Sequence, residues 1–326
     1  MKRGLQAAIH SGGLTLHPFT EADLDDLHSA TLEILERTGV LVEADDAIDI
    51  LADSGCKTDR QTHIVKIPPE LVTQSVRSAR RSFLLAGRDP EHDVMVEVGR
   101  VTVAPFAEGI MVNDLETGEN RQSTKQDVED IMRVTDALSQ MDINIVPVTA
   151  RDVPVETAEV HHIEAALKST TKPILMAMTQ KHSAELGLDM AAAVVGGHDA
   201  LRERPLLCYC TCPVGPMYLT RELTDIDIEC ARKGMPFCCI SMDMTGASAP
   251  ITLASTLVVQ NAELLASLVL NQLVAAGSPF YYGTSTCAFE LRQGSAAVGT
   301  PEMALIQAGT AALANYYSIP SFTAGY

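Results

Sequence analysis

Residues 205–242, PLLCYCTCPVGPMYLTRELTDIDIECARKGMPFCCISM, decide the fold. The stretch begins with a strand-like apolar run at 205–211 and ends with a second one at 236–242. Between them, residues 221–233 have the composition and spacing of a helix. Two strands that are joined through a helix run in the same direction, because parallel strands need a long crossover connection. The stretch therefore predicts one strand–helix–strand unit of a parallel sheet.

The same alternation recurs along the chain from about residue 142. Strand-like runs occupy residues 143–148, 173–178, 205–211, 236–242, 279–284 and 320–323. Helical stretches separate most of these runs, at residues 156–168, 182–195, 221–233, 253–274 and 301–316. A repeated βα pattern requires a parallel sheet with helices packed against it.

Two folds satisfy this pattern, a doubly wound open sheet and a TIM (β/α)8 barrel. No strand is followed by a G-x-G-x-x-G loop, which weakens the doubly wound alternative. Several strands open with a proline, and this repeated entry favours the equivalent units of a barrel: Pro173, Pro205, Pro236, Pro279 and Pro320. We therefore predict an α/β TIM barrel. A barrel needs eight strands and we count six, so we expect it to be incomplete at the C-terminus of this chain.

The first hundred residues predict a helical cap region. Thr20 is placed to cap a helix that Gly39 ends. Two further helices fit residues 44–52 and 68–80, and short strands fit residues 83–85 and 94–98. We expect two parts, residues 1–100 as the cap region and residues 101–326 as the barrel.

A hairpin is expected at the start of the second part. Its strands would be residues 101–105 and 110–113, with a turn through Thr117-Gly118 following them. Ser123 or Thr124 is then placed to cap the next helix.

Composition excludes several classes of partner. Among 326 residues, 46% are apolar and 20% are charged, as in globular proteins. The net charge of −18 argues against binding to nucleic acid or to an anionic membrane surface, because both attract clustered Lys and Arg.

No membrane or export segment is evident in the sequence. Residues 1–19 lack the apolar core of a signal peptide. The most apolar segment, residues 253–276, is interrupted by polar side chains, and we interpret it as a buried barrel helix: Gln260, Asn261, Glu263, Asn271 and Gln272. We expect a cytoplasmic protein.

Most of the eight cysteines lie inside apolar runs, as buried thiols do in a reducing compartment. Cys208, Cys210 and Cys212 alternate along one strand, so they share a face, and three thiols can bind zinc. Tetrahedral sites usually gather ligands from several elements, whereas ligands on one strand diverge. We therefore expect core thiols and no metal.

Candidate site residues follow from the barrel prediction. Active groups of a TIM barrel lie at the C-terminal ends of its strands. Those that we expect to face a ligand there are Tyr209, Thr211, Tyr282, Thr284, Gly325 and Tyr326. The tyrosines can attract a methylated cation through their ring faces, or alternatively fill the barrel or contact helices.

Three acidic residues are candidates for catalysis. Asp243 comes just past a predicted strand, and Glu263 lies in a strongly apolar helix, where an unpaired carboxylate is costly. Glu263 therefore either anchors backbone or an arginine, or reaches the site. Glu302 follows Thr300 and Pro301, which suit the N-cap and first position of a helix, so Glu302 is either a favourable first-turn acid or a site residue.

An ordered set of short motifs runs through the chain. It comprises TGASAP at 245–250, NAE at 261–263, YG at 282–283, GTPE at 299–302 and IP at 319–320. Residues 32–39 and the turn at 113–118 belong to the same pattern. This set resembles the trimethylamine:corrinoid methyltransferase family, which includes glycine betaine methyltransferases, and the likeness covers nearly the whole chain.

The resemblance implies a TIM barrel that moves a methyl group from trimethylamine to the Co(I) of a corrinoid, in methylamine metabolism of the methanogenesis type. It implies a cognate corrinoid protein as partner, with the cobalamin-type cofactor carried by that partner and none bound by this chain. We also expect a homo-oligomer. In the trimethylamine enzymes the family places pyrrolysine, encoded by UAG, just after the segment that matches residues 319–326. Glu302 would then contact the pyrrolysine ring or balance substrate charge.

Three alternatives stay open. A glycine betaine or other quaternary amine methyltransferase would need no pyrrolysine. A non-catalytic scaffold would only bind the corrinoid protein. A zinc hydrolase would need the cysteine site considered above.

The first prediction concerns the gene. We expect an in-frame UAG codon directly after the codon for Tyr326, followed by sequence that encodes two more βα units. Reading the nucleotide sequence tests this expectation. A sense codon at that position would favour the betaine-type enzyme, and a UAA or UGA stop without a homologous continuation would contradict the prediction.

Overall fold

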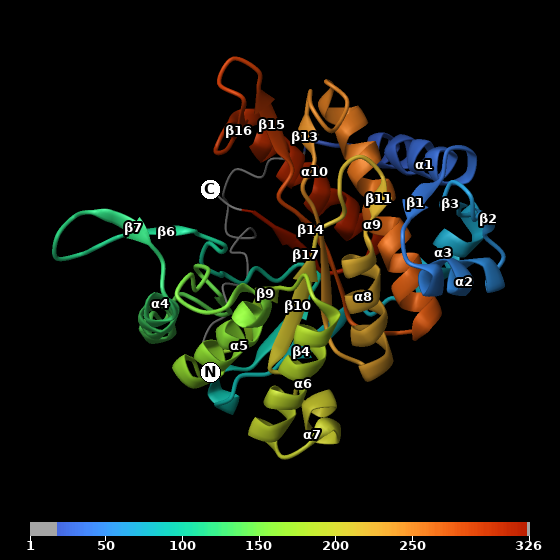
Figure 1. Cartoon of the computed structure of the whole chain (residues 1–326). Coiled ribbons are helices and arrows are strands. Elements are labelled where there is room, and N and C mark those ends of the chain that lie inside the picture. The colour runs from blue at the N-terminus through green and yellow to red at the C-terminus, as the bar shows by residue number, and fades with distance from the viewer. Residues whose placement is uncertain (1–17, 325–326) are drawn as a thin grey trace. The chain divides into compact units, whose positions relative to one another are not determined.

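The computed structural model describes residues 18–324 (Figure 1), and contacts group them into two compact units. The first unit is Phe83–Cys210. The second unit combines the described residues up to Ser82 with those from Thr211 onward. The division thus falls near residues 82 and 210, whereas the sequence suggested a boundary at residue 100.

The first unit contains three parallel strands, β8 (Asn144–Ile145), β9 (Ile174–Ala177) and β10 (Leu207–Thr211). β9 lies between the other two, with Ile174 opposite Asn144 on one side and Leu207 on the other. The helices of this unit are α4 (Lys125–Ala137), α5 (Ala158–Ser169), α6 (Lys181–Val195) and α7 (His198–Glu203), with 3-10 turns at Pro90–His92 and Val155–Thr157. Three of the six predicted strands are therefore confirmed here.

The other three predicted strands lie in the second unit as β12 (Phe237–Ser241), β14 (Phe280–Thr284) and β17 (Ser321–Thr323). They pair in parallel, with β14 in the middle. The helices α8 (Arg221–Lys233), α9 (Leu253–Val274) and α10 (Pro301–Tyr317) alternate with them as predicted. A small sheet of β13 (Met244–Thr245), β15 (Cys287–Glu290) and β16 (Ser295–Ala297) follows the ends of β12 and β14.

The predicted N-terminal helices are confirmed as α1 (Glu21–Arg37), α2 (Asp45–Asp53) and α3 (Pro69–Ser78). Thr20 caps α1, with its hydroxyl accepting from the Asp23 backbone N–H. A four-stranded sheet accompanies them, in the order β11 (Tyr218–Leu219), β1 (Val40–Val42), β3 (Ile64–Lys66) and β2 (Lys57–Asp59). Because β11 comes from the segment after β10, this sheet joins the cap helices to the rest of the second unit.

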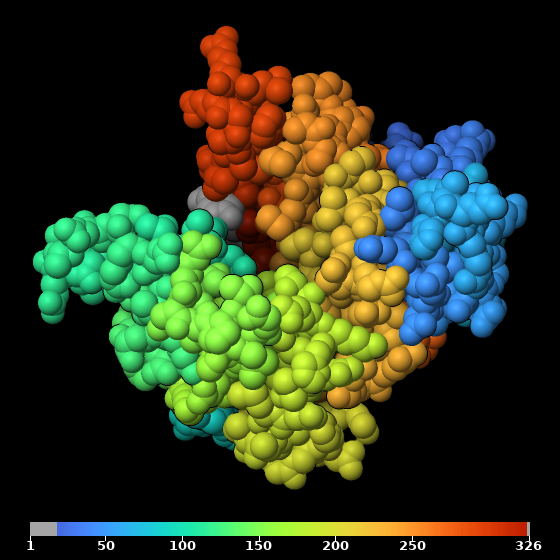
Figure 2. Space-filling view, in the orientation of Figure 1, coloured from blue at the N-terminus to red at the C-terminus, as the bar shows by residue number. Residues whose placement is uncertain are grey.

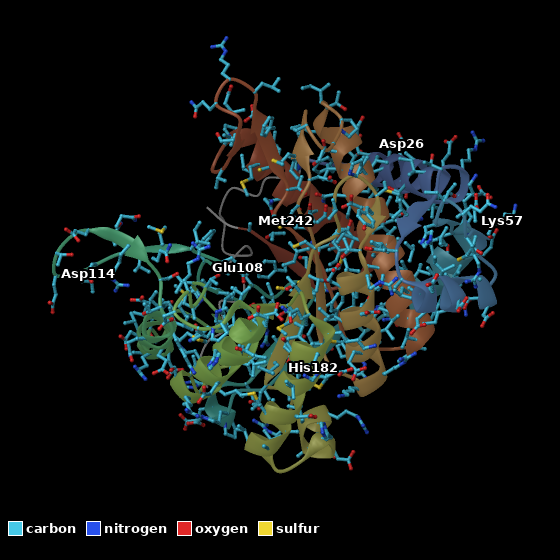
Figure 3. All side chains as sticks on the ribbon, viewed as in Figure 1. Asp26, Lys57, Glu108, Asp114, His182 and Met242 are labelled. Atoms are coloured by element: carbon cyan, nitrogen blue, oxygen red, sulfur yellow. The ribbon has the colours of Figure 1, made fainter. Side chains whose placement is uncertain are left out.

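The prediction of a hairpin between residues 101–105 and 110–113 is wrong in the strand that pairs with residues 111–113. β6 (Met111–Asn113) pairs with β7 (Asn120–Gln122), not with residues 101–105, which form no strand. The Asp114 side chain accepts from the backbone N–H groups of Glu116 and Thr117, which closes the turn. Figure 2 shows this arm standing out beside α4, and Figure 3 labels Asp114 on it. The arm follows β4 (Ser82–Leu85) and β5 (Val94–Glu97), and Thr124 caps α4 after it, as predicted.

Helix α9 is the buried centre of the second unit and packs against α1, α3, α8 and α10. Figure 1 shows it beside α8 and the N-terminal helices. It is the one helix among residues 18–324 that is long and apolar enough to cross a membrane, and most of it is buried within the protein. The prediction of a buried helix for this segment is therefore confirmed.

Close packing in the first unit depends on a glycine. A Cβ atom added at Gly187 of α6 would lie 2.3 Å from Tyr209 Oη and 2.3 Å from Ile163 Cδ1. The Tyr209 hydroxyl donates to the Ala184 carbonyl on α6 at 3.0 Å, so its position is held. The absent side chain at residue 187 lets β10, α5 and α6 approach one another.

We predict that Gly187→Ala lowers the free energy of unfolding by about 1–3 kcal/mol, as overpacking does. Replacing glycine by alanine in a helix usually stabilises by up to about 1 kcal/mol, so the sign separates the two effects. Chemical denaturation measures it. Tyr209→Phe removes one of the two clashing atoms, so the double variant should lose less stability than the two single losses added together. A Gly187→Ala protein more stable than the wild type would contradict this packing.

Candidate functional site

The strongest candidate site lies just past the end of β12. Asp243 follows β12 by two residues, and its side chain is fully buried. Its Oδ1 atom accepts from the Ser248 hydroxyl at 3.4 Å, whereas its Oδ2 atom has no hydrogen-bond partner among residues 18–324. The Asp243 backbone N–H donates to Thr286 Oγ1 at 3.1 Å. A buried carboxylate oxygen without a donor is costly, so Oδ2 is expected to meet a proton, a water or a ligand.

Glu263 of α9 reaches the same strand end. It is fully buried; its Oε1 atom accepts from the Met217 backbone N–H at 2.8 Å, and its Oε2 atom accepts from the Ser241 hydroxyl at 2.9 Å. Ser241 is the last residue of β12, two residues before Asp243. Glu263 therefore anchors the backbone of Met217, which is one of its two predicted roles. Its hydrogen bond with Ser241 also brings it near Asp243, the candidate site of the other predicted role.

The two carboxyls influence each other's protonation. Burial raises the pKa of Asp243, and the Ser248 and Ser241 hydroxyls lower it only in part. Burial also raises the pKa of Glu263, and the negative charge of Asp243 raises it further, against hydrogen bonds from Met217 and Ser241. No Lys or Arg of the described residues forms an ion pair with either carboxyl. The pair therefore holds a proton at neutral pH, as a property of both groups together.

A surface glycine lies directly against the pair. A Cβ atom at Gly215 would stand 2.0 Å from Asp243 Oδ1 and 3.2 Å from Ser248 Oγ, so only glycine fits here. Gly215 is itself partly exposed, so the backbone that lies against Asp243 borders the protein surface. Sequence reasoning missed Gly215 and Thr286. Ser248 was within the TGASAP motif, but nothing in the sequence signalled its contact with Asp243.

Two sulfur-containing side chains of the second unit meet next to Thr211 and Asp243. The Cys212 thiol, just past β10, donates to the Met242 thioether at 3.2 Å, and Met242 is 53% exposed (Figure 3). Thr211 precedes Cys212 and is buried, and its hydroxyl has no hydrogen-bond partner within the described range. Thr211 precedes Cys212 in the chain, and Asp243 follows Met242. Both residues were predicted as site residues from their positions at strand ends, and each has a buried polar atom without a hydrogen-bond partner among the described residues.

Three other predicted residues face helices. Tyr209 donates to α6, as described above, and the Tyr282 hydroxyl donates to Asn261 Oδ1 of α9 at 2.6 Å. The Thr284 hydroxyl lies 3.1 Å from Gln260 Oε1, also on α9. The residues alternate along β14, so Tyr282 and Thr284 share the face that packs on α9. This geometry argues against the ligand-facing role predicted for all three, and favours the alternative of contact with helices.

The remaining predicted residues are not brought to Asp243 by any contact of the described residues. Glu302 is exposed in the first turn of α10, where Thr300 is the N-cap and Pro301 follows it, as predicted. Gly325 and Tyr326 lie outside the described residues. Cys208 and Cys210 are buried in β10, and residues 18–324 contain no group of three or more His, Cys, Asp or Glu side chains placed to hold a metal.

Residues 3–326 match the family of trimethylamine methyltransferases (MTTB). The chain belongs to the trimethylamine methyltransferase family. It is 40% identical over 313 residues to trimethylamine methyltransferase MttB of Desulfitobacterium hafniense (strain DSM 10664 / DCB-2), covering 96% of this chain and 63% of that protein. MttB of Methanosarcina thermophila is 36% identical, with 96% and 66% covered. The glycine betaine methyltransferase of D. hafniense (strain Y51) is 28% identical, with 94% and 64% covered.

The chain thus spans about two thirds of the length of these relatives. Among solved structures, the monomethylamine methyltransferase (MtmB) of Methanosarcina barkeri resembles it with a TM-score of 0.56. That likeness has 14% sequence identity and covers 94% of this chain and 68% of the other. At this identity the likeness concerns the fold alone, and it agrees with a family member built on parallel strands and helices.

We predict that Glu263→Gln becomes more stable relative to the wild type as pH rises. In the unfolded chain a glutamate ionises near pH 4.3, whereas the raised pKa keeps folded Glu263 protonated to higher pH. Protonated Glu263 contributes stability that is fully present below pH 4, and the wild type loses this stability as pH rises through the raised pKa of folded Glu263. The neutral amide of Glu263→Gln avoids this loss. We expect the variant to gain about 1–3 kcal/mol over the wild type between pH 5 and pH 8.5.

Denaturant melts at several pH values measure this difference. Gln can still accept from Met217 and can pair with Ser241, so the fold should persist. Asp114→Asn is the control and should show a constant difference over the same range, because hydrogen bonds from Thr117 and Arg121 lower the pKa of Asp114 and keep it ionised above pH 5. A Glu263→Gln difference that does not change with pH would contradict the assignment of a raised pKa.

Proposed function

We propose that the complete protein that contains this chain transfers a methyl group from trimethylamine to the cobalt of a corrinoid protein. The family match over residues 3–326 carries the proposal. Two relatives named trimethylamine methyltransferase are more similar to the chain than the glycine betaine enzyme is. The Asp243–Glu263 pair supports it, because its acidic groups suit a positively charged amine.

The reaction is a displacement at a methyl carbon. Trimethylamine is an ammonium ion in neutral water, and an amine leaves readily only from a positively charged nitrogen. In the proposed step the Co(I) of the corrinoid, which is the second substrate, supplies the electron pair of the new Co–C bond. The C–N bond breaks, its electron pair stays on nitrogen, and the products are methyl–Co(III) and neutral dimethylamine. The protein's part is to hold the ammonium with one methyl group aimed along the line of attack.

Asp243 is the side chain of the described residues that we assign to the ammonium. We also assign Thr211, whose buried hydroxyl has no partner among the described residues, to the substrate as a further polar contact. Glu302 remains a candidate for contact with the substrate or with pyrrolysine. The pyrrolysine expected after Tyr326 remains a prediction.

We further propose that the complete protein forms a full TIM barrel, is cytoplasmic, assembles as a homo-oligomer and docks a cognate corrinoid protein at the C-terminal ends of the strands. The parallel order within each unit supports the barrel. The corrinoid would be carried by the partner, since the proposed role of this chain is to present the amine.

The activity is tested with the complete protein, produced from its whole gene. We expect methylcobalamin to form from cob(I)alamin and trimethylamine, followed by its absorption spectrum, and more slowly with Asp243→Asn, by at least about tenfold, since a charged contact is lost. Methyl transfer from glycine betaine but not from trimethylamine would establish the betaine alternative. Transfer from neither compound, with free cobalamin or with a corrinoid protein, would refute the proposal.

A further inference from the structure

We propose that Asp243 and Glu263 form a binding site for a singly charged methylated ammonium ion, in which Glu263 keeps a proton and Asp243 accepts the ligand's N–H. This inference rests on the proposed function and specifies the residues, the charge and the substrate class. It does not require the chain to catalyse transfer.

One oxygen of the pair has no hydrogen-bond donor among the described residues. Asp243 is fully buried, and Oδ2 lacks a donor among the described residues, although Oδ1 accepts from Ser248. Both oxygens of the adjoining Glu263 are satisfied. Buried polar atoms in folded proteins are almost always hydrogen-bonded. The single free acceptor of the pair is therefore the place where a donor from outside the chain completes the structure.

The net charge of the pair matches that of a monocation. Two carboxyls that lie together without a cation cannot both be ionised at low cost. One retained proton leaves a single negative charge, which matches a monocation. Glu263 is the member placed to keep the proton, because a protonated Oε2 can donate to Ser241 while Oε1 still accepts from Met217. Asp243 then carries the charge on the atom that has no partner.

The surroundings of the pair suit a small methylated ligand. The backbone of partly exposed Gly215 lies against Asp243, so the carboxyl is close to the surface. Met217 donates its backbone N–H to Glu263, and Met242 and Met244 precede and follow Asp243 in the sequence; none of the three methionines is fully buried. We expect such thioether side chains to supply an adaptable apolar surface for the N-methyl groups. The segment 213–217 would need to shift to admit the ligand.

The geometry also sets specificity. Trimethylammonium has one N–H, whereas tetramethylammonium has none and cannot complete the hydrogen bond. Glycine betaine has no N–H and adds a carboxylate, which the negative pair repels. The site should therefore prefer trimethylammonium to both.

Binding to the complete protein, produced from its whole gene, is measured by isothermal titration calorimetry at pH 7.5, with trimethylammonium, tetramethylammonium and glycine betaine as probes. We expect the wild type to bind trimethylammonium at least about tenfold more tightly than either other probe. Asp243→Asn should lose this affinity by at least about tenfold, and Glu263→Gln should keep it within about threefold, because the amide preserves the single negative charge.

Asp227→Asn is the matched control. Asp227 is also fully buried in the second unit, but its oxygens accept from Ser267 and Asn271, so its loss should not affect binding. Circular dichroism melts of all variants show whether each is folded. The proposal is overturned if the folded wild type does not bind trimethylammonium, if tetramethylammonium binds equally well, or if Asp243→Asn binds as the wild type does. Loss of binding in Glu263→Gln alone would reverse the two roles and also overturn it.

The binding experiment and the methyl-transfer assay distinguish failure of the proposed site from failure of the proposed function. Binding without transfer by the complete protein would refute the proposed function and leave the site intact. Transfer from trimethylamine by a protein in which Asp243→Asn changes neither affinity nor KM would refute the site alone.

Discussion

The second unit depends on one constraint, which is that every polar side chain of the buried helix α9 needs a partner. Leaving a buried polar group without a hydrogen bond costs about 1–3 kcal/mol, and α9 is buried along almost its whole length. Gln260 donates to Thr310 of α10 at 2.5 Å. Asn261 donates to Thr31 of α1 and to Tyr317 of α10, each at 2.9 Å. These bonds fix the register of α9 against its neighbours, because a rotation of the helix would break them together.

The same constraint extends to the strands and to α8. Tyr282 of β14 donates to Asn261, and Asp227 of α8 accepts from Ser267 and Asn271 of α9. Burial raises the pKa of Asp227 to about 7, against these two hydrogen bonds. Glu263 belongs to this series and takes both its partners from the segment around the end of β12. Glu263 differs from the other polar residues of α9 in its neighbour Asp243, whose Oδ2 atom has no hydrogen-bond partner among the described residues. Helix α9 thus places its own buried polar groups in satisfied positions, and one of them, Glu263, lies near an unsatisfied carboxyl that follows β12.

The fold was largely predictable because its local signals agree. The alternation of apolar runs with helical stretches placed six strands, and Thr20, Thr124 and Thr300 marked helix starts through their hydroxyls. Residues 101–105 were wrongly predicted to pair with β6, because an apolar run gives no information on which strand it pairs with. The turn at Asp114 instead sets β7 as the partner of β6. The short strands β1, β2, β3 and β11 were missed, since two or three residues leave no periodicity to detect.

The site was predictable only in part, for a different physical reason. Asp243 and Glu263 could be found because acids in apolar surroundings are conspicuous in a sequence. Their proximity on either side of Ser241 could not, since it depends on the approach of α9 to β12. The choice between a ligand and a helix as the partner of Tyr209 and Tyr282 stayed open in the sequence, because strand alternation tells which residues share a face but not which face meets helices. The central claim is that the Asp243–Glu263 pair holds a proton at neutral pH. Infrared difference spectra of the carboxyl C=O band at pH 7 test it most directly, in Asp227→Asn protein, which removes the contribution of Asp227 itself, compared with the same protein that also carries Glu263→Gln. A protonated-carboxyl band that Glu263→Gln removes is the predicted result, and a band unchanged by Glu263→Gln would contradict it.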